Sequence, residues 1–265
     1  MKHINYADID FTKLYKLDRQ GTKSTTYTDG KNCYKIFNNM DFYELYDLEQ
    51  KFKSIKKLRV SNLILPKNFI TVDDQVIGYT MKYFKNSQSI YDKYLFEEKI
   101  NIKEFFHLMI KCGSILRNMH RNGIICGDLN FDNILFNKKG EIMFCDIDSC
   151  EYGDYASPYV SKFLNNLIVE YRSKDLEVSE NTDRITMLLS IFNVLYNEEL
   201  RNFDKRQYII YEDDSDNIKS IKEYVNILFD RRRKIPYIPY LDEILDGSED
   251  YIFDVEEENR LLKRK

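Results

Sequence analysis

The alternation of apolar and polar positions predicts that the chain begins with short strands. Residues 13–37 place apolar and polar side chains in short alternating runs, which is typical of half-buried strands. Asp29-Gly30 is a favourable pair for a tight hairpin turn. The run NCYKIF that follows predicts a strand at 32–37 with Lys35 inside it.

One helix and two further strands are predicted to complete this first part. Residues 63–72 and 76–84 are short apolar runs separated by two aspartates, which predicts two strands joined by a turn. Between residues 41 and 58 the apolar positions recur at the spacing of a helix. These positions are Phe42, Leu45, Leu48, Phe52 and Ile55.

The second part of the chain is predicted to be mainly helical. An amphipathic pattern covers residues 101–120, and Asn122-Gly123 follows as a favourable helix stop. A turn at 137–140 leads into the apolar run EIMFCDIDSC. Further helices are predicted at 181–200 and within 217–245.

The polar stretch FKNSQS at 84–89 marks the boundary between the two parts. We therefore expect an N-terminal domain at 1–84, rich in β-structure, and a mainly helical C-terminal domain at 85–265. A chain of 265 residues is long enough for one domain built of two lobes with a sizeable core. The fold class expected from these patterns is α+β.

Composition and charge argue against several classes of function. The chain has 40 basic and 44 acidic residues and a net charge of −4, so nothing indicates bulk attraction to nucleic acid. No apolar run reaches the length of about 18 residues that a membrane span needs. The opening residues MKHINYADIDFTK lack the apolar core of a signal peptide. We expect a cytoplasmic protein that binds neither nucleic acid nor membrane; its oligomeric state stays open.

The five cysteines suggest neither a disulfide framework nor a zinc site. Their number is odd and no C-x-x-C pair occurs, so buried thiols in a reducing compartment are the expected state.

Three oxygen-bearing side chains are expected to converge in the middle of the chain. In the segment IICGDLNFDNILF, Asp128 and Asn133 stand between two apolar runs that would fix the ends of a loop. The turn at 137–140 should bring the strand after Asn133 beside the strand before Asp146. Oxygen ligands of this kind suit Mg²⁺, and a further carboxylate could take a proton from a hydroxyl. The pattern favours phosphoryl transfer.

The same residues resemble the motifs of the protein-kinase-like superfamily. CGDLNFDN at 126–133 is similar to the catalytic loop H-R-D-L-x-x-x-N, and Asp146-Ile147-Asp148 is similar to the metal-binding D-F-G. The resemblance extends to divergent bacterial Ser/Thr kinases and to aminoglycoside and choline phosphotransferases. It implies that Asp128 is the catalytic base and that Asn133 and Asp146 hold Mg²⁺. Asp148 is expected to be a hydrogen-bonded turn residue, with a metal ligand as the alternative.

The resemblance implies a nucleotide site in the first part of the chain. Lys35 in CYKIF resembles the strand lysine that pairs with phosphates, and Glu49 on the next helix is the expected ion-pair partner, with Glu44 as the alternative. Gly21 begins GTKSTT, a degenerate phosphate-binding loop. In GYTMKYF, the resemblance makes Met81 the gatekeeper and the segment Lys82, Tyr83 and Phe84 the adenine-binding hinge.

Departures from the kinase pattern leave the substrate class open. Gly127 stands in place of the catalytic-loop arginine, so control through a phosphorylated activation loop is not expected. Cys126 stands in place of a structural histidine and is expected to be packed; His120 is expected to cap the end of its helix or to pack. In NTDRITMLLSIF, Asp183 resembles the buried aspartate that braces the catalytic loop.

The resemblance implies an ATP- and Mg²⁺-dependent kinase with a two-lobed protein-kinase-like fold, whose acceptor is a hydroxyl group. A divergent serine/threonine protein kinase is the first hypothesis. A small-molecule kinase of the aminoglycoside or choline type is the second, and a pseudokinase that binds partners without turnover is the third. The segment from Asp146 to Asp183 is modest in length, which slightly favours a protein acceptor.

Overall fold

The computed structural model describes residues 1–17, 24–38, 42–58, 60–156, 178–196, 208–230 and 236–263. The chain is an α+β protein that divides into two compact units. The first unit consists of Met1–Ser87 and Asn137–Asp148, and the second of Gln88–Phe136 and Ser149–Lys265. The segment Asn137–Asp148 therefore belongs to the first unit. The division predicted from the sequence, with a single boundary at 84–89, places this segment in the C-terminal part.

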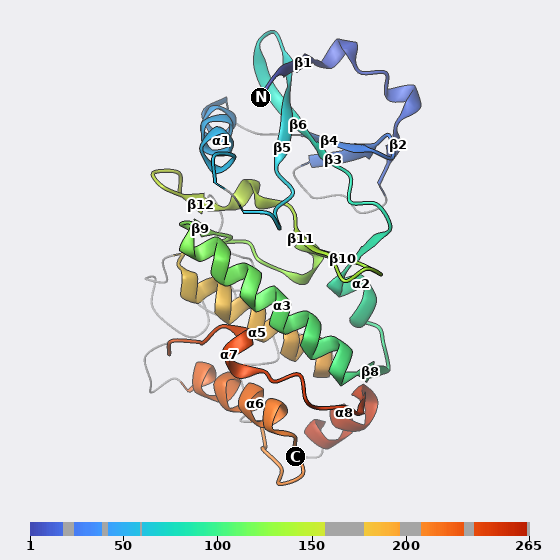
Figure 1. Ribbon diagram of the computed structural model, residues 1–265, viewed down its shortest axis with the longest axis vertical. Coiled ribbons are helices and arrows are strands. Elements are labelled where there is room, and N and C mark those ends of the chain that lie inside the picture. Colours follow the sequence, from blue (N-terminus) through green and yellow to red (C-terminus); the bar gives the residue numbers. More distant parts are fainter. Residues whose placement is uncertain are drawn as a thin grey trace. The chain divides into compact units, whose positions relative to one another are not determined.

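The first unit is built on a six-stranded sheet with the order β1-β5-β6-β4-β3-β2 (Figure 1). The pairing of β1 with β5 is parallel and the other pairings are antiparallel. The strands are β1 (His3–Asn5), β2 (Tyr15–Lys16), β3 (Ser24–Thr28), β4 (Asn32–Phe37), β5 (Pro66–Val72) and β6 (Gln75–Lys82). Two 3₁₀ turns, η1 (Tyr6–Asp8) and η2 (Phe11–Lys13), connect β1 to β2.

The predicted hairpin turn joins β3 to β4. The carboxylate of Asp29 accepts hydrogen bonds from the backbone N–H groups of Lys31 and Asn32, at 2.7 and 2.6 Å. Gly30 has a φ of 81°, a left-handed conformation that glycine adopts without a steric penalty. This turn fixes the register of β3 against β4, in which Thr26 lies opposite Lys35. On the other side of β4, Lys35 lies directly opposite Tyr79 of β6.

Helix α1 (Phe42–Ile55) covers one face of the sheet, as the apolar spacing predicts. Its described apolar residues Leu48, Phe52 and Ile55 are buried, and the ring of Phe52 lies edge-on to Tyr79 with centroids 5.6 Å apart. The helix is thereby anchored to the strand that faces Lys35.

Strand β11 (Ile142–Phe144) attaches the returning segment to the first unit. The N–H of Ile64 donates to the carbonyl of Phe144 at 2.8 Å, and the N–H of Phe144 donates to the carbonyl of Asn62 at 2.8 Å. The Asn62 side chain donates to the carbonyl of Ile142 at 2.9 Å. These contacts fix the backbone that leads into Asp146.

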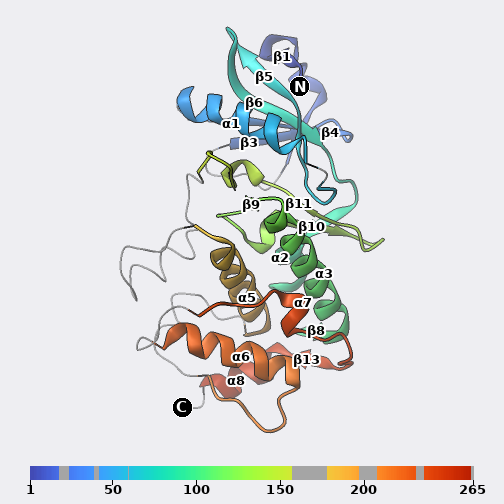
Figure 2. The same ribbon diagram turned by 60° about the vertical axis from the view of Figure 1, so that its left-hand side comes forward.

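The second unit is mainly helical (Figures 1 and 2). Its helix α5 is buried along almost its whole length and forms the centre of this unit, while the short helix α7 packs against α3, α5 and α6. The helices are α2 (Ile90–Tyr94), α3 (Ile102–Arg121), α5 (Glu180–Tyr196), α6 (Asp216–Phe229), α7 (Leu241–Ile244) and α8 (Val255–Lys263). None of the helices within the described ranges has the length and apolarity needed to cross a bilayer.

Short strands tie the ends of these helices together. β9 (Ile124–Ile125) pairs with β12 (Glu151–Tyr152), and β8 (Lys99–Asn101) pairs with β13 (Ile252–Asp254), both antiparallel. The remaining elements are β7 (Ser87–Ser89), β10 (Ile134–Asn137), η3 (Phe131–Asn133) and η4 (Ile147–Ser149). η3 closes the loop that contains Asp128.

Gly78 of β6 provides a test of the strand packing beneath Lys35. A Cβ atom at position 78 would overlap the backbone oxygen of Lys35, which no side-chain rotation can relieve. We expect Gly78→Ala to lower the free energy of unfolding by about 1–3 kcal/mol, measured by urea denaturation. Gln75→Ala, at an exposed position of the same strand, is the control. Equal stability of the two variants would contradict this packing.

Candidate functional site

Lys35 is a buried lysine in the middle of a strand. Its side chain is only 7% exposed, and it shares a sheet face with Cys33 and Phe37. A lysine at such a position must be compensated by opposite charge, since an isolated buried ammonium is very costly. The compensating groups come from the segment that follows β11.

Asp146 and Asp148 both contact the ammonium of Lys35. Asp148 accepts hydrogen bonds from Lys35 Nζ at 3.0 and 2.9 Å through its two oxygens, and Asp146 forms a close ion pair with the same nitrogen. The backbone at Asp146 has a φ of 56°, a left-handed conformation that non-glycine residues adopt infrequently but that aspartate tolerates better than most. We call Lys35, Asp146 and Asp148 the lysine–aspartate cluster; it lies wholly within the first unit.

The cluster separates the pKa values of its two carboxyl groups. Burial and the neighbouring Asp148 carboxylate raise the pKa of Asp146 to about 7, although Lys35 opposes the shift. Burial would also raise the pKa of Asp148, but Lys35 and hydrogen bonds lower it to about 2. Burial alone would lower the pKa of Lys35, but Tyr79 and the two aspartates raise it well above its usual value. Lys35 therefore stays charged at neutral pH.

Two residues that the sequence did not single out complete the cluster. The Tyr79 hydroxyl donates to Asp148 Oδ1 at 3.3 Å, and Lys51 Nζ donates to the backbone carbonyl of Asp148 at 2.7 Å. Lys51 lies on the apolar face of α1, between the buried Leu48 and Ile55. A lysine among apolar positions was the signal that could have identified it.

The expected ion pair between Lys35 and Glu49 is a prediction that the structure corrects. Glu49 instead pairs with His3 Nε2 at 3.0 Å and with Lys53 Nζ at 2.7 Å. The physical reason is that the two aspartates already compensate the Lys35 ammonium, while His3 and Lys53 lie beside Glu49. The side chain of Glu44, the alternative partner, lies outside the described residues.

The donor set of the cluster suits a hard divalent cation. The carboxylates of Asp146 and Asp148 both contact the Lys35 ammonium, and the Asp146 side chain is 46% exposed, so a ligand can reach it. Mg²⁺ prefers one or two carboxylates together with water and substrate phosphates. Within the described ranges no group of three or more His, Cys, Asp or Glu side chains has an arrangement that could hold a metal by itself. Asp146 and Asp148 are the two carboxylates of the cluster that could serve as ligands of such a cation.

Asp128 and Asn133 lie together on a loop of the second unit. Asn133 Nδ2 donates to the backbone carbonyl of Asp128 at 3.2 Å, and Asn130 Oδ1 accepts from the backbone N–H of Asn133 at 3.1 Å. The N–H of Asp128 donates to the carbonyl of Cys126 at 2.8 Å around Gly127, whose φ of 70° suits glycine. Leu129, Phe131 and Ile134 are buried and anchor the loop.

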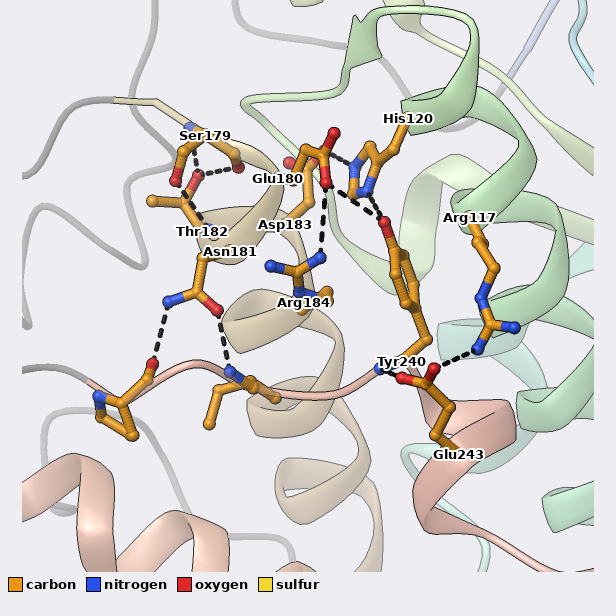
Figure 3. Close-up of polar contacts among 12 residues, drawn as sticks. Arg117, His120, Ser179, Glu180, Asn181, Thr182, Asp183, Arg184, Tyr240 and Glu243 are labelled. Atoms are coloured by element: carbon orange, nitrogen blue, oxygen red, sulfur yellow. Dashed lines mark hydrogen bonds and ion pairs between the residues drawn. The ribbon is translucent and has the colours of Figure 1, made fainter.

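Asp183 braces this loop, which confirms the expectation from the sequence. Its carboxylate accepts from the backbone N–H groups of Cys126 at 2.7 Å and Gly127 at 3.0 Å. His120 Nε2 lies 2.9 Å from the same carboxylate, and both side chains are 1% exposed (Figure 3). Cys126 is buried, as predicted. The turn before Asp128 is thus held by a fully buried, fully hydrogen-bonded carboxylate.

The residues predicted to form the gatekeeper and the hinge lie at the end of β6 and directly after it. Met81 and Lys82 end β6 and pair with Cys33 and Asn32 of β4; the N–H of Tyr83 donates to the carbonyl of Lys31 at 3.0 Å. The carbonyl of Phe84 accepts from the Ser87 hydroxyl. Gly21 lies outside the described residues.

In comparisons with known proteins, no family model matches the sequence and no curated protein matches it. Function must therefore be inferred from these residues and their contacts.

The two aspartates of the cluster should respond oppositely to pH in metal-free buffer. Because the folded state raises the pKa of Asp146, its contribution to stability falls as pH rises from about 4 to about 7. Asp146→Asn should therefore gain stability relative to the wild type between about pH 5 and pH 8, by on the order of 1 kcal/mol after allowance for its exposure. Melting temperatures measured in EDTA across this range test the expectation.

Asp148→Asn is the matched control for this measurement. The lowered pKa of Asp148 means that its contribution is present above about pH 4 and is lost only as pH falls toward about 2. This variant should be less stable than the wild type between about pH 5 and pH 8. The difference should narrow as pH rises, because removing the Asp148 carboxylate also removes one cause of the raised pKa of Asp146. A stability difference between Asp146→Asn and the wild type that does not change with pH would contradict the assignment.

Proposed function

We propose that this chain is an ATP- and Mg²⁺-dependent phosphotransferase with a two-lobed protein-kinase-like fold, which moves the γ-phosphate to a hydroxyl group. The first candidate for the acceptor is a serine or threonine of a protein. The observation that carries the proposal is the convergence of Lys35, Asp146 and Asp148 on one buried ion cluster, although 111 positions separate Lys35 from Asp146. A buried lysine with two carboxylates is suited to phosphate and metal together.

Lys35 would bind phosphate oxygens. Its stem is fixed in β4 opposite Tyr79, and its ammonium keeps its charge because its pKa is raised well above the usual value. Asp146, the more exposed of the two carboxylates, and Asp148 are the residues of the cluster that would hold Mg²⁺. A bound Mg²⁺ would neutralise negative charge on the phosphates. Tyr79 and Lys51 orient Asp148 and its backbone.

Asp128 would accept the proton of the acceptor hydroxyl. Asp128 is a partly exposed residue, and its backbone is fixed by the Gly127 turn and by Asp183. A general base needs this combination of access and fixed direction. In Asn133 the amide nitrogen donates to the carbonyl of Asp128, so the amide oxygen is the atom that would serve a cation.

The presence of Lys35, Asp128 and Asp146 favours an enzyme over a pseudokinase, which would normally lack one of the three. Lys35, Asp128 and Asp146 are all retained, and Lys35 and Asp146 are in contact. Two carboxylates beside one buried lysine carry a desolvation cost in free energy, and a chain that only bound partners would not require such an arrangement.

Nucleotide binding is the first consequence to test. ATP with Mg²⁺ should raise the melting temperature, since a ligand that binds only the folded state stabilises it by about 2.7 kcal/mol at about 100 times its Kd. Lys35→Met should weaken ATP binding at least about tenfold, a loss of about 1.4 kcal/mol. Lys53→Met removes a half-exposed lysine from α1 and is the matched control. Absence of any shift at millimolar ATP and Mg²⁺ would refute the proposal.

Variants of the 126–133 loop should change the rate of phosphate transfer without an equal change in ATP affinity. Asp128→Asn preserves shape but removes the carboxylate, so transfer of labelled phosphate should fall by about 10²–10⁴-fold while ATP affinity stays unchanged. Asn133→Ala should show a loss that higher Mg²⁺ partly restores. If both variants instead lose melting temperature and activity together, and Mg²⁺ rescues neither, the two side chains only brace the loop.

A further inference from the structure

A buried chain of hydrogen bonds runs from Asp183 away from the 126–133 loop. His120 Nε2 lies 2.9 Å from Asp183 Oδ2, and His120 Nδ1 lies 2.8 Å from the Tyr240 hydroxyl (Figure 3). All three side chains belong to the second unit and are buried. These hydrogen bonds therefore connect Tyr240, the residue before α7, with the Asp183 carboxylate that holds the turn at Gly127.

The partners fix the direction of each hydrogen bond. An ionised carboxylate can only accept, so the Nε2 that faces Asp183 carries a proton and donates. In the neutral imidazole Nδ1 is then an acceptor, and the Tyr240 O–H donates to it. Burial and Glu180 raise the pKa of Tyr240 above its usual value of 10.0, which keeps the hydroxyl protonated. Tyr240 thereby selects the tautomer and the ring orientation of His120.

Tyr240 is itself held on several sides. Its ring lies between two guanidinium groups, with the Cζ atoms of Arg117 and Arg184 each 4.8 Å from the ring centroid. Its backbone N–H donates to Glu243 Oε2 at 2.9 Å, and Arg117 pairs with Glu243 at 3.0 Å. The hydroxyl also lies 3.3 Å from Glu180 Oε2, a longer contact than the one to His120. The shorter distance makes His120 the preferred acceptor.

We propose that Tyr240 is a positioning residue for Asp128, acting through His120 and Asp183 on the backbone of Cys126 and Gly127. The proposal rests on the proposed function, in which Asp128 takes the proton of the acceptor. Loss of the Tyr240 hydroxyl leaves Nδ1 of a buried histidine without its donor, so the ring can turn and Asp183 loses its hydrogen bond from His120. The turn that directs Asp128 then becomes less constrained.

Tyr240→Phe removes the hydroxyl group alone and so tests its contribution. The variant keeps the ring between Arg117 and Arg184 and keeps the backbone contact to Glu243. Tyr237→Phe is the matched control, because Tyr237 also lies over Arg184, at 4.4 Å, yet is 64% exposed. Each variant is made in the full chain and compared by amide hydrogen exchange and by transfer of labelled phosphate from ATP to a mixture of serine- and threonine-containing peptides.

We expect Tyr240→Phe to accelerate exchange at the amides of Cys126 and Gly127 at least about tenfold, since these are the N–H groups that Asp183 binds. Turnover should fall about five- to twentyfold with the KM for ATP unchanged. Tyr237→Phe should change neither quantity. In a His120→Gln background, Tyr240→Phe should have no further effect on exchange, because the hydroxyl acts through His120.

The outcomes distinguish this proposal from the proposed function. Unchanged exchange at Cys126 and Gly127 in Tyr240→Phe would overturn the positioning role, even if that variant were less active. Faster exchange at these two amides supports the role, whether or not the wild-type chain transfers phosphate. Absence of transfer by the wild-type chain to every peptide would count against the proposed function alone.

Discussion

Burial of the Lys35 ammonium is the constraint on which the first unit depends. A charge in the interior of a sheet is tolerated only when opposite charge and hydrogen bonds compensate it. The compensating carboxylates come from Asp146 and Asp148. The chain must therefore return to the first unit after residues 88–136, which belong to the second. The contacts of β11 with residues 62–64 and of Lys51 with the Asp148 carbonyl maintain that return.

The second unit follows a similar principle with a different charge. Asp183 is fully buried, and its oxygens accept from two backbone N–H groups and face His120. A buried polar network is rigid only when each member is satisfied, and here the hydroxyl of Tyr240 lies 2.8 Å from the remaining ring nitrogen of His120. In each unit a buried and compensated charge thus fixes a segment with a more exposed aspartate: Lys35 fixes the segment of Asp146, and Asp183 fixes the loop of Asp128.

Local pattern was sufficient to predict much of this structure. The Asp29-Gly30 turn, the strand around Lys35 and the helix with Leu48, Phe52 and Ile55 follow from spacing and turn chemistry, which act over a few residues. The partner of Lys35 was predicted wrongly because sequence distance does not show which carboxylate reaches it. Lys51 and Tyr240 were missed for the same reason: their contacts join positions 97 and 120 apart.

The left-handed backbone at Gly127 restricts which residues this position can hold. A side chain there would cost roughly 1–2 kcal/mol, because Cβ comes too close to the backbone in that conformation. The strain would fall on the turn whose two N–H groups Asp183 holds. A substitution at position 127 would therefore disturb the backbone that leads into Asp128, whatever the chemistry of the new side chain.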